Sequence, residues 1–401
     1  MNGLLGATLT LLIANASAQQ PPPGLLPAVS VKPREPAREI DKLPPELRGH
    51  FVIAQRGMEW LRLDNQPDGK FTPGILPALA AKSDSDPLQP QIEATATLIR
   101  AAVYFKDERA LVLGKQALLR MLQETMVDPR KPGLRFTSAP DLFANRLAAC
   151  GGLLRAIHEL PNPPADLFEQ GEELANYILS RRRTDGTFEF DDEAMRANLT
   201  QSCTGPALAG LMRSDKRKDN VRLETLAKAC PVHIAAWRQA KSPAMLADHA
   251  VAYADAFAQS GAVGFAQAVF ELSDWALSQQ IPSDPRQPLT SGGFIPWRDG
   301  KATTLPPDAT SAPFVICVAA GCRAARQAGD TQRHERYRKS LDASMSFLGT
   351  LQYTESRVLH FADGFRPWVY GGFFNSHQDG NLSLQNHQQI LRALLDGIAS
   401  Q

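Results

Sequence analysis

Helical periodicity runs along almost the whole chain and limits the folds that it can adopt. From residue 46 to residue 399, apolar side chains recur at the three- and four-residue spacing of an α-helix, while strand signals are few and short. The pattern predicts about twelve helices, or about six helix hairpins. They are expected at residues 46–64, 90–106, 108–124, 141–160, 165–182, 195–213, 219–239, 243–259, 261–280, 308–328, 331–352 and 383–399.

A similar turn follows four of the odd-numbered helices. An aromatic residue and a leucine end each helix, and a glycine-containing turn then leads to a phenylalanine. The Asp-Gly pairs favour a positive φ angle, and the phenylalanine is expected to tuck back under the next helix. The four turns are Asp68-Gly69-Lys70-Phe71, Asp185-Gly186-Thr187-Phe188, Gly292-Gly293-Phe294 and Gly371-Gly372-Phe373.

Small residues distinguish the even-numbered helices. Examples are the runs at 148–152, 205–210 and 318–321, which consist mainly of alanine, glycine and cysteine. Small side chains let helices approach closely, as an inner ring around a common axis requires. The even-numbered helices are therefore predicted to form the inner ring and the odd-numbered helices the outer one.

This alternation of helix, Gln- or Asp-Gly-x-Phe turn and small-residue helix resembles the α/α toroids. These include the terpenoid cyclase and prenyltransferase-like toroids and the glycan-active (α/α)6 barrels, such as N-acylglucosamine 2-epimerase-like and polysaccharide-lyase-like proteins. The resemblance covers roughly residues 46–400 and implies an all-α, (α/α)6-type toroid of about six helix hairpins. It implies little about function, because toroids carry out many reactions.

The N-terminal residues predict export. A short apolar stretch, residues 4–14, is followed by Ala16-Ser17-Ala18, the small residues that a signal peptidase accepts. The expected organisation is a signal peptide at 1–18, a Pro-rich linker at 19–45 and the toroid at 46–401, with a secreted or periplasmic location. No basic residue precedes the apolar stretch, which is atypical. The stretch is too short to serve as a stable membrane anchor.

Composition and motifs narrow the classes of partner. The 43 Lys and Arg residues balance 42 Asp and Glu residues, so nothing favours nucleic acid or an anionic membrane as a partner. The five cysteines show no zinc-ligand spacing and no disulfide framework, and nucleotide-binding motifs are absent. We therefore expect no cofactor and no metal. The oligomeric state is left open.

Polar residues at the starts of the even-numbered helices are the first candidates for a site, because the loops entering an inner ring surround one mouth of its cavity. Asp191 and Asp192 could serve as catalytic acid and base, since adjacent carboxylates raise each other's pKa. Acidic residues at a helix start also suit the helix dipole, so a structural role is the alternative. His249 is predicted to bind substrate, and Asp141 and Asp308 are predicted to cap helices. The further candidates in such positions are Asp141, Asn145, Glu193, Asn198, Asp248, His249, Asp308 and Asn386.

The loop at residues 363–379 combines aromatic, histidine and acidic residues and is too long for a simple connector. It predicts a catalytic group of Tyr370, His377 and, in the following helix, His387. Substrate contacts are expected from Trp368, Arg366 and Asp379, together with Trp297 from a second aromatic loop. The alternative is that the aromatic residues plug one end of the toroid.

Three functional hypotheses follow. The first is a carbohydrate-active toroid, a lyase, hydrolase or epimerase acting on a polymeric or acidic sugar, with a glycan as its partner. The second is a non-catalytic binding or structural toroid, because no strong catalytic motif is present. The third is a terpenoid cyclase-like protein, although the chain lacks the acidic DxDD and DDxxD motifs.

Overall fold

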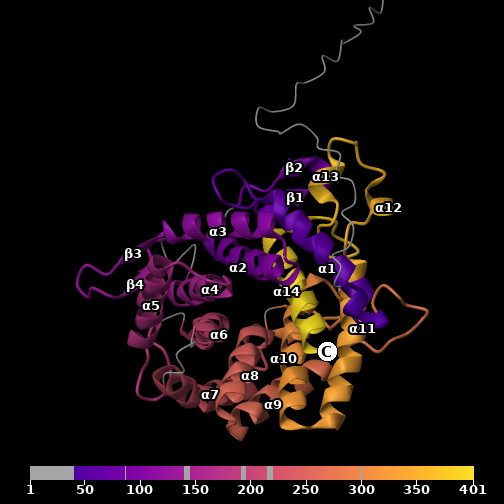
Figure 1. Ribbon diagram of the computed structural model, residues 1–401. Coiled ribbons are helices and arrows are strands. Elements are labelled where there is room, and N and C mark those ends of the chain that lie inside the picture. The colour runs from indigo at the N-terminus through magenta and orange to yellow at the C-terminus, as the bar shows by residue number, and fades with distance from the viewer. Residues whose placement is uncertain (1–39, 86, 140–144, 191–195, 215–219, 299) are drawn as a thin grey trace, which may run out of the picture. The chain divides into compact units, whose positions relative to one another are not determined.

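The computed structural model describes residues 40–401 except 86, 140–144, 191–195, 215–219 and 299. Twelve long helices in this part of the chain form two concentric rings (Figure 1). The inner helices pack side by side in chain order and the last contacts the first, which closes the ring. They are α2 (Leu88–Tyr104), α4 (Arg146–Glu159), α6 (Arg196–Ser214), α8 (Ala247–Ser260), α10 (Ala312–Ala328) and α14 (Leu384–Ser400).

The outer helices pack on the inner ring as α1 (Pro45–Asp64), α3 (Glu108–Leu122), α5 (Ala165–Ser180), α7 (Asn220–Ala240), α9 (Val263–Ser278) and α11 (Thr331–Thr350). The predictions of an all-α toroid of six hairpins and of an inner ring made by the even-numbered helices are thus confirmed. Three inner helices begin four or five residues later than predicted. Two of them follow short 3-10 turns, η4 (Pro243–Met245) and η5 (Ala309–Ser311), while α4 begins at Arg146 after the cap residue Asn145.

The connections fall into two classes. Those from an inner to an outer helix are short, such as 105–107 and 160–164, whereas most of those from an outer to an inner helix are long. The long connections hold the short strands, two hairpins and one three-stranded antiparallel sheet. The hairpins are β3 (Thr125–Val127) with β4 (Arg135–Thr137) and β5 (Trp297–Arg298) with β6 (Lys301–Ala302).

The three-stranded sheet joins the two ends of the ring. It contains β1 (Gly74–Leu76), β2 (Ala81–Lys82) and β7 (Leu382–Ser383) in the order β2-β1-β7. Its register places Gly74 opposite Ser383 and Ile75 opposite Leu382. The loop after the first helix is therefore bonded to the loop before the last one. Four further short elements are η1 (Ile40–Lys42), η2 (Pro77–Leu79), α12 (Glu355–Val358) and α13 (Arg366–Val369).

The repeated turn has the predicted geometry at all four places. Each turn glycine has a positive φ, at 87°, 86°, 83° and 85° for Gly69, Gly186, Gly292 and Gly371. The phenylalanine two residues later is at most 1% exposed and pairs back as a single β-bridge to the residues that follow the outer helix. A Cβ at Gly186 would lie 2.3 Å from the Lys228 carbonyl oxygen on the next outer helix. The turn therefore serves as the contact between successive outer helices.

Small residues set the spacing of the inner ring, most tightly between α4 and α6. A Cβ built on Gly151 would lie 2.3 Å from the carbonyl oxygen of Pro206, and one on Gly210 would lie 2.4 Å from that of Gly151. Backbone atoms cannot move aside as flexible side chains do, so both positions require glycine.

We expect Gly151→Ala to lower the free energy of unfolding by about 1–3 kcal/mol, the usual cost of overpacking. Gly49→Ala is the matched control, because Gly49 lies in α1 with nothing within 4 Å of an added Cβ. It should stabilise the protein by about 0.5–1 kcal/mol through the higher helix propensity of alanine. Urea unfolding followed by circular dichroism measures both values, and equal effects of the two substitutions would contradict the close approach of α4 and α6.

All five cysteines are buried and unpaired. Burial raises the pKa of the Cys322 thiol to about 11 and that of the Cys317 thiol to about 12. Buried thiols of this kind are unreactive and pack as small apolar residues. In the described part of the chain, no helix is both long and apolar enough to cross a bilayer.

Candidate functional site

A cavity of about 530 Å³ lies at the end of the ring where the inner helices begin. All six inner helices or the residues directly before them contribute to it, because the long connections enter the ring at this end. Half of its lining residues are polar, and side-chain amides are the most frequent polar group among them. The polar lining residues are Gln89, Glu93, Asn145, Ser202, Asp248, Thr310, Gln385, Gln388, Gln389 and Arg392.

Trp297 provides an aromatic surface on this cavity. The residue lies in β5, and its ring packs on Trp275 of α9 with a centroid distance of 5.4 Å. Trp275 in turn stacks on Phe314 of α10 at 6.0 Å, so the indole is held by a buried aromatic group. A fixed aromatic face beside amide groups is the arrangement that binds a sugar ring, whose faces are apolar and whose edges carry hydroxyl groups.

Two buried polar atoms of lining residues have no hydrogen-bond partner in the part of the chain that the structure describes: Nε1 of Trp297, a donor, and Oε1 of Gln89, an acceptor. Leaving such an atom unpaired costs about 1–3 kcal/mol. A ligand hydroxyl can both accept from an indole and donate to an amide oxygen. Both atoms are covered by protein in this structure, so a ligand hydroxyl would reach them only after the side chains turn.

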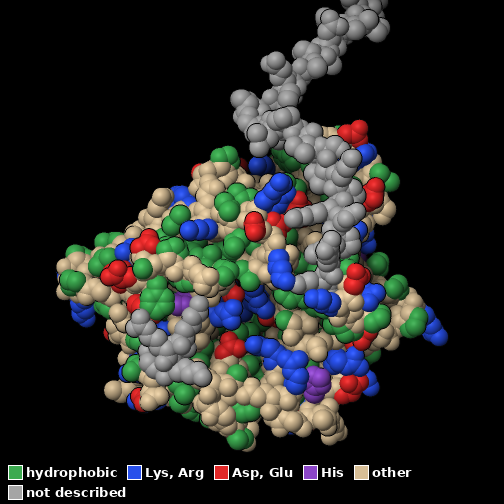
Figure 2. Space-filling view, in the orientation of Figure 1, with side chains coloured by type: hydrophobic (Ala, Val, Ile, Leu, Met, Phe, Trp, Pro, Cys, Tyr) green, Lys and Arg blue, Asp and Glu red, His purple; other side chains and the backbone are tan. Residues whose placement is uncertain are grey.

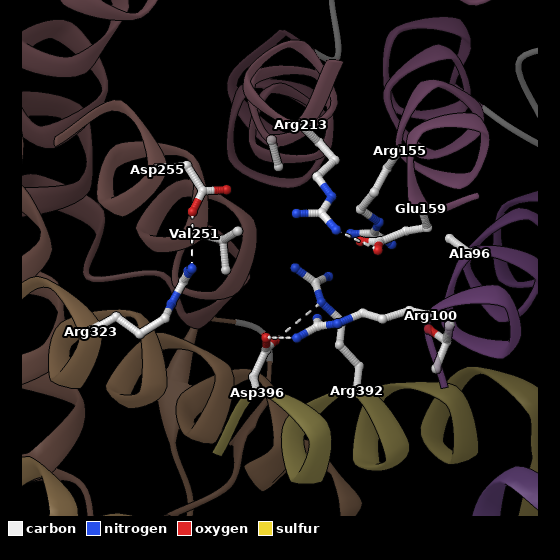
Figure 3. A pocket seen from close by; sticks show the side chains of 12 residues that line it. Ala96, Arg100, Arg155, Glu159, Arg213, Val251, Asp255, Arg323, Arg392 and Asp396 are labelled. Atoms are coloured by element: carbon white, nitrogen blue, oxygen red, sulfur yellow. Dashed lines mark hydrogen bonds and ion pairs between the residues drawn. The ribbon is translucent and has the colours of Figure 1, made fainter. Parts of the chain in front are cut away.

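Ion pairs form the floor of the cavity. Arg155 of α4 contacts Glu93 of α2 and lies 3.2 Å from Asp248 of α8. Asp248 is also 2.7 Å from Arg392 of α14. The chain of ion pairs continues through Asp396, 3.7 Å from Arg392, to Arg100, 2.5 Å from Asp396 (Figure 3). Side chains from four inner helices thus cross the axis of the ring.

Asp248 is held in its ionised form. Burial by itself raises its pKa, but the attraction of Arg392 and Arg155 outweighs burial and leaves the pKa below its usual value. At neutral pH this carboxylate can accept a hydrogen bond or stabilise positive charge, and it cannot act as a proton donor.

Some of the residues chosen from the sequence lie at this cavity. Trp297, Asn145 and Asp248 line it, and Asn145 also caps α4 by accepting from the Leu147 amide at 3.0 Å. Asp308 accepts from the Thr310 amide at 2.9 Å, so its predicted capping role is confirmed. The catalytic candidates Asp191 and Asp192, like Asp141 and Glu193, lie outside the described residues.

His249 does not line the cavity, although it follows Asp248 directly. It is 1% exposed, and its Nε2 lies 2.9 Å from Oγ1 of Thr204 in α6. The ring of His233 is 5.3 Å away, and burial lowers the pKa of His249 to about 4. These contacts make His249 a neutral residue between inner helices rather than a group that reaches substrate.

His387 is fully buried between α14 and α1. Its Nδ1 accepts from the Phe373 amide at 3.2 Å, and its Nε2 lies 2.9 Å from the Gly57 carbonyl oxygen. Burial lowers its pKa to about 3. Since both ring nitrogens are bonded to backbone, the contacts support a structural role and not the predicted proton transfer.

The other candidates of the C-terminal loop lie beside α1 and β1, at the periphery of the ring (Figure 1), and the lining of the cavity contains none of them. Arg366 is bonded to the carbonyl oxygens of Phe361 and Leu359 and to Asp363. His377 Nε2 lies 3.0 Å from Thr350 Oγ1, and Asp379 accepts from Asn375 within its own turn. The backbone of Trp368 accepts from Trp60, and the half-buried Tyr370 packs on the core.

The structure therefore separates residues that sequence reasoning placed together. It also shows lining residues that sequence reasoning missed, chiefly the glutamines and the arginine of α14. The available signal was their spacing, since Gln385, Gln388, Gln389 and Arg392 fall on one face of a helix over two turns. Among the described residues, no group of three His, Cys, Asp or Glu side chains is placed to hold a metal ion.

The sequence matches no protein-family model and no curated protein sequence. Solved structures share the fold. A D-mannose isomerase superposes with a TM-score of 0.62 at 10% identity, covering 90% of this chain and 100% of that chain. An unsaturated glucuronyl hydrolase specific for heparin gives 0.56 at 11% identity, covering 88% and 96%.

The α-1,6-mannanase of Salegentibacter sp. HEL1_6 gives a TM-score of 0.56 at 11% identity, covering 86% of this chain and 98% of that chain. Identities this low establish the (α/α)6 toroid fold and carry no residue-level correspondence.

Proposed function

We propose that this (α/α)6 toroid is a carbohydrate-active protein and that the cavity lined by Trp297 and the α14 glutamines is its sugar-binding site. The observation that carries the proposal is the lining of this cavity, in which an aromatic face lies beside a wall of side-chain amides. The terpenoid alternative needs an apolar cavity, and the charged and amide groups among the polar half of this lining argue against it.

The structural neighbours support the same class of ligand. Their names describe a D-mannose isomerase, an α-1,6-mannanase and an unsaturated glucuronyl hydrolase specific for heparin. A shared fold does not transfer a substrate. The likeness adds to the argument only because this chain has, in the same architecture, a cavity lined by an aromatic ring and side-chain amides.

Neutral sugars are the expected ligands. The charged residues that line the described part of the cavity are Glu93, Asp248 and Arg392, and Arg392 is bonded to Asp248. Two carboxylates against one arginine give these lining residues a net charge of −1, which repels the carboxylate of a uronate. The acidic-sugar variant of the sequence hypothesis is therefore disfavoured.

For catalysis, we propose the pair predicted from the sequence, Asp191 and Asp192, directly before α6. Two carboxylates can share the acid and base roles of glycoside hydrolysis. The neighbouring mannanase has also been solved as an inactive variant in which two consecutive aspartates are replaced, in complex with α-1,6-mannotriose. If Asp191→Asn with Asp192→Asn leaves turnover intact, this assignment is wrong. If no glycan is turned over yet sugars bind, the non-catalytic alternative holds.

Trp297→Ala should weaken binding of a neutral oligosaccharide by at least about tenfold, because it removes the stacking surface. Trp368→Ala is the matched comparison, since it removes the same side chain from the C-terminal loop. Titration calorimetry against neutral, amino and uronate oligosaccharides measures both variants. Loss of binding with Trp368→Ala but not with Trp297→Ala would move the site to the loop and overturn the proposal.

Export by residues 1–18 is a separate proposal that cell fractionation tests.

A further inference from the structure

A second, smaller cavity lies toward the opposite end of the inner ring. Its volume is about 100 Å³, and residues from all six inner helices line it. Most belong to the later turns of their helices, and guanidinium groups dominate (Figure 3). The arginines are Arg100, Arg155, Arg213, Arg323 and Arg392. On the face seen in Figure 2, basic side chains gather with a few acidic ones around the middle of the ring.

We propose that this arginine cavity binds a small oxyanion, with the chemistry of a phosphate or sulfate group. The proposal is independent of the sugar site at the other end of the ring, with which the cavity shares only Arg392. A volume of about 100 Å³ is several times what one ordered water needs, so a tetrahedral anion fits without rearrangement.

The arginines form a rim and a floor. Arg213, Arg323 and Arg100 have side chains that are 47%, 35% and 28% exposed, whereas Arg155 and Arg392 are 9% and 8% exposed. Each rim arginine is paired through one nitrogen, Arg213 to Glu159 at 2.6 Å and Arg323 to Asp255 at 3.0 Å. Since a guanidinium group carries five N–H donors, most rim donors remain for a ligand. Figure 3 shows Arg213, Arg392 and Arg100 directed toward one another.

The local charge favours an anion. Five arginines and three carboxylates line the cavity, which leaves an excess of two positive charges. The floor arginines pair with Glu93 and Asp248, which lie on the far side of the floor. Glu93 comes seven residues before Arg100 on α2, and Asp248 comes seven residues before Asp255 on α8. Seven residues of helix correspond to about 10 Å along the axis.

The competing explanation is structural. Six helices end near this cavity, and arginines there offset the negative ends of the helix dipoles. The two explanations differ in the effect of Glu159. If the arginines only balance charge, removing the Glu159 carboxylate gains nothing for a ligand. If the cavity binds an anion, the carboxylate competes with it for Arg213.

The test is calorimetric titration of the full chain with inorganic phosphate and, separately, sulfate, at an ionic strength held constant with chloride. We expect one saturable site. Glu159→Gln should tighten phosphate binding about tenfold, and Arg213→Gln should weaken it about tenfold, the effect of one charged partner. Arg323→Gln is a second rim variant in case Arg213→Gln does not fold. Sulfate binding without phosphate binding would show a preference within the proposed class and supports it.

The control is Arg326→Gln, an exposed residue on α10 that does not line the cavity and should leave phosphate affinity unchanged. Trp297→Ala should also leave it unchanged, which separates failure of this proposal from failure of the sugar site. The proposal is overturned if chloride reproduces the heat signals of phosphate. It is also overturned if the Glu159→Gln variant binds phosphate no better than the parent protein.

Discussion

Replacing Arg155 with methionine should lower the free energy of unfolding by about 3–5 kcal/mol, because it leaves two buried carboxylates without their shared counterion. Arg155 is 8% exposed and bridges Glu93 and Asp248 across the axis of the ring. Asp248 retains Arg392, but Glu93 loses its arginine altogether. The expected result is a lower urea midpoint, with the helical signal of the folded state unchanged.

A neutralised network provides the control. The double variant Arg155→Met with Glu93→Gln removes both charges of one pair while Asp248 keeps Arg392, and it should recover most of the lost stability, since buried ion pairs contribute little net energy over neutral groups. Arg238→Met breaks an exposed pair with Glu271 and should leave the urea midpoint unchanged within error. A double variant no more stable than Arg155→Met alone would show that the arginine acts through packing and not through charge.

The ion pairs on the axis follow from the architecture. Small residues bring neighbouring inner helices into contact, as Gly151 and Gly210 do between α4 and α6. A closed ring of six helices then leaves an axis too wide for alanine and glycine to fill. Long side chains can reach across it, and arginine does so while bonding carboxylates from other helices, as Arg155 and Arg392 do here.

The fold could be predicted from local signals. Helical periodicity placed the long helices, and the four glycine–phenylalanine turns gave the repeat that joins successive outer helices. The run at 148–152 indicated an inner helix because small residues are needed where backbones meet. Each of these features lies within about 25 residues of sequence, so no knowledge of distant contacts was required.

The site could be predicted only in part. The rule that polar residues at the starts of the inner helices surround a cavity led to Asn145 and Asp248, and the second aromatic loop led to Trp297; all three line the cavity. The aromatic and histidine residues of the C-terminal loop were also expected at the site, but they do not line this cavity. His387 illustrates the reason, since one of its partners, the Gly57 carbonyl oxygen, is 330 residues away in sequence. Whether a histidine faces a cavity or a backbone carbonyl depends on such distant contacts, which composition does not reveal.

Lowering the pH from about 7.5 to about 5 should destabilise the protein, and the buried histidines are the main cause. Burial lowers the folded-state pKa of His233 and His387 to about 3 and that of His249 to about 4, against 6.5 for the unfolded chain. Below pH 6.5 these histidines therefore bind protons in the unfolded state but not in the folded state. Stability is complete above pH 6.5 and is lost as the pH falls, by about 2 kcal/mol per histidine at pH 5.

Asp64 acts in the opposite direction. Burial raises its folded-state pKa to about 7, from 3.8 in the unfolded chain, so the folded state takes up a proton that the unfolded state does not hold at pH 5. That gain of about 2–3 kcal/mol offsets roughly one histidine, and the net loss expected is about 3–4 kcal/mol. Asp248 and Asp396, whose pKa values lie below the usual carboxylate value, contribute to a separate loss below about pH 4.

Urea unfolding at several pH values between about 7.5 and 5 measures this loss directly. His387→Asn should be less stable at pH 7.5 but should lose about 2 kcal/mol less on acidification, because one buried titrating group is gone. Asp64→Asn should steepen the loss, since the offsetting proton uptake disappears. His360→Asn is the matched control, an exposed histidine whose removal should leave the profile unchanged. If His387→Asn and His360→Asn gave the same profile as the parent protein, His387 would not be the neutral, backbone-bonded residue that its two hydrogen bonds indicate.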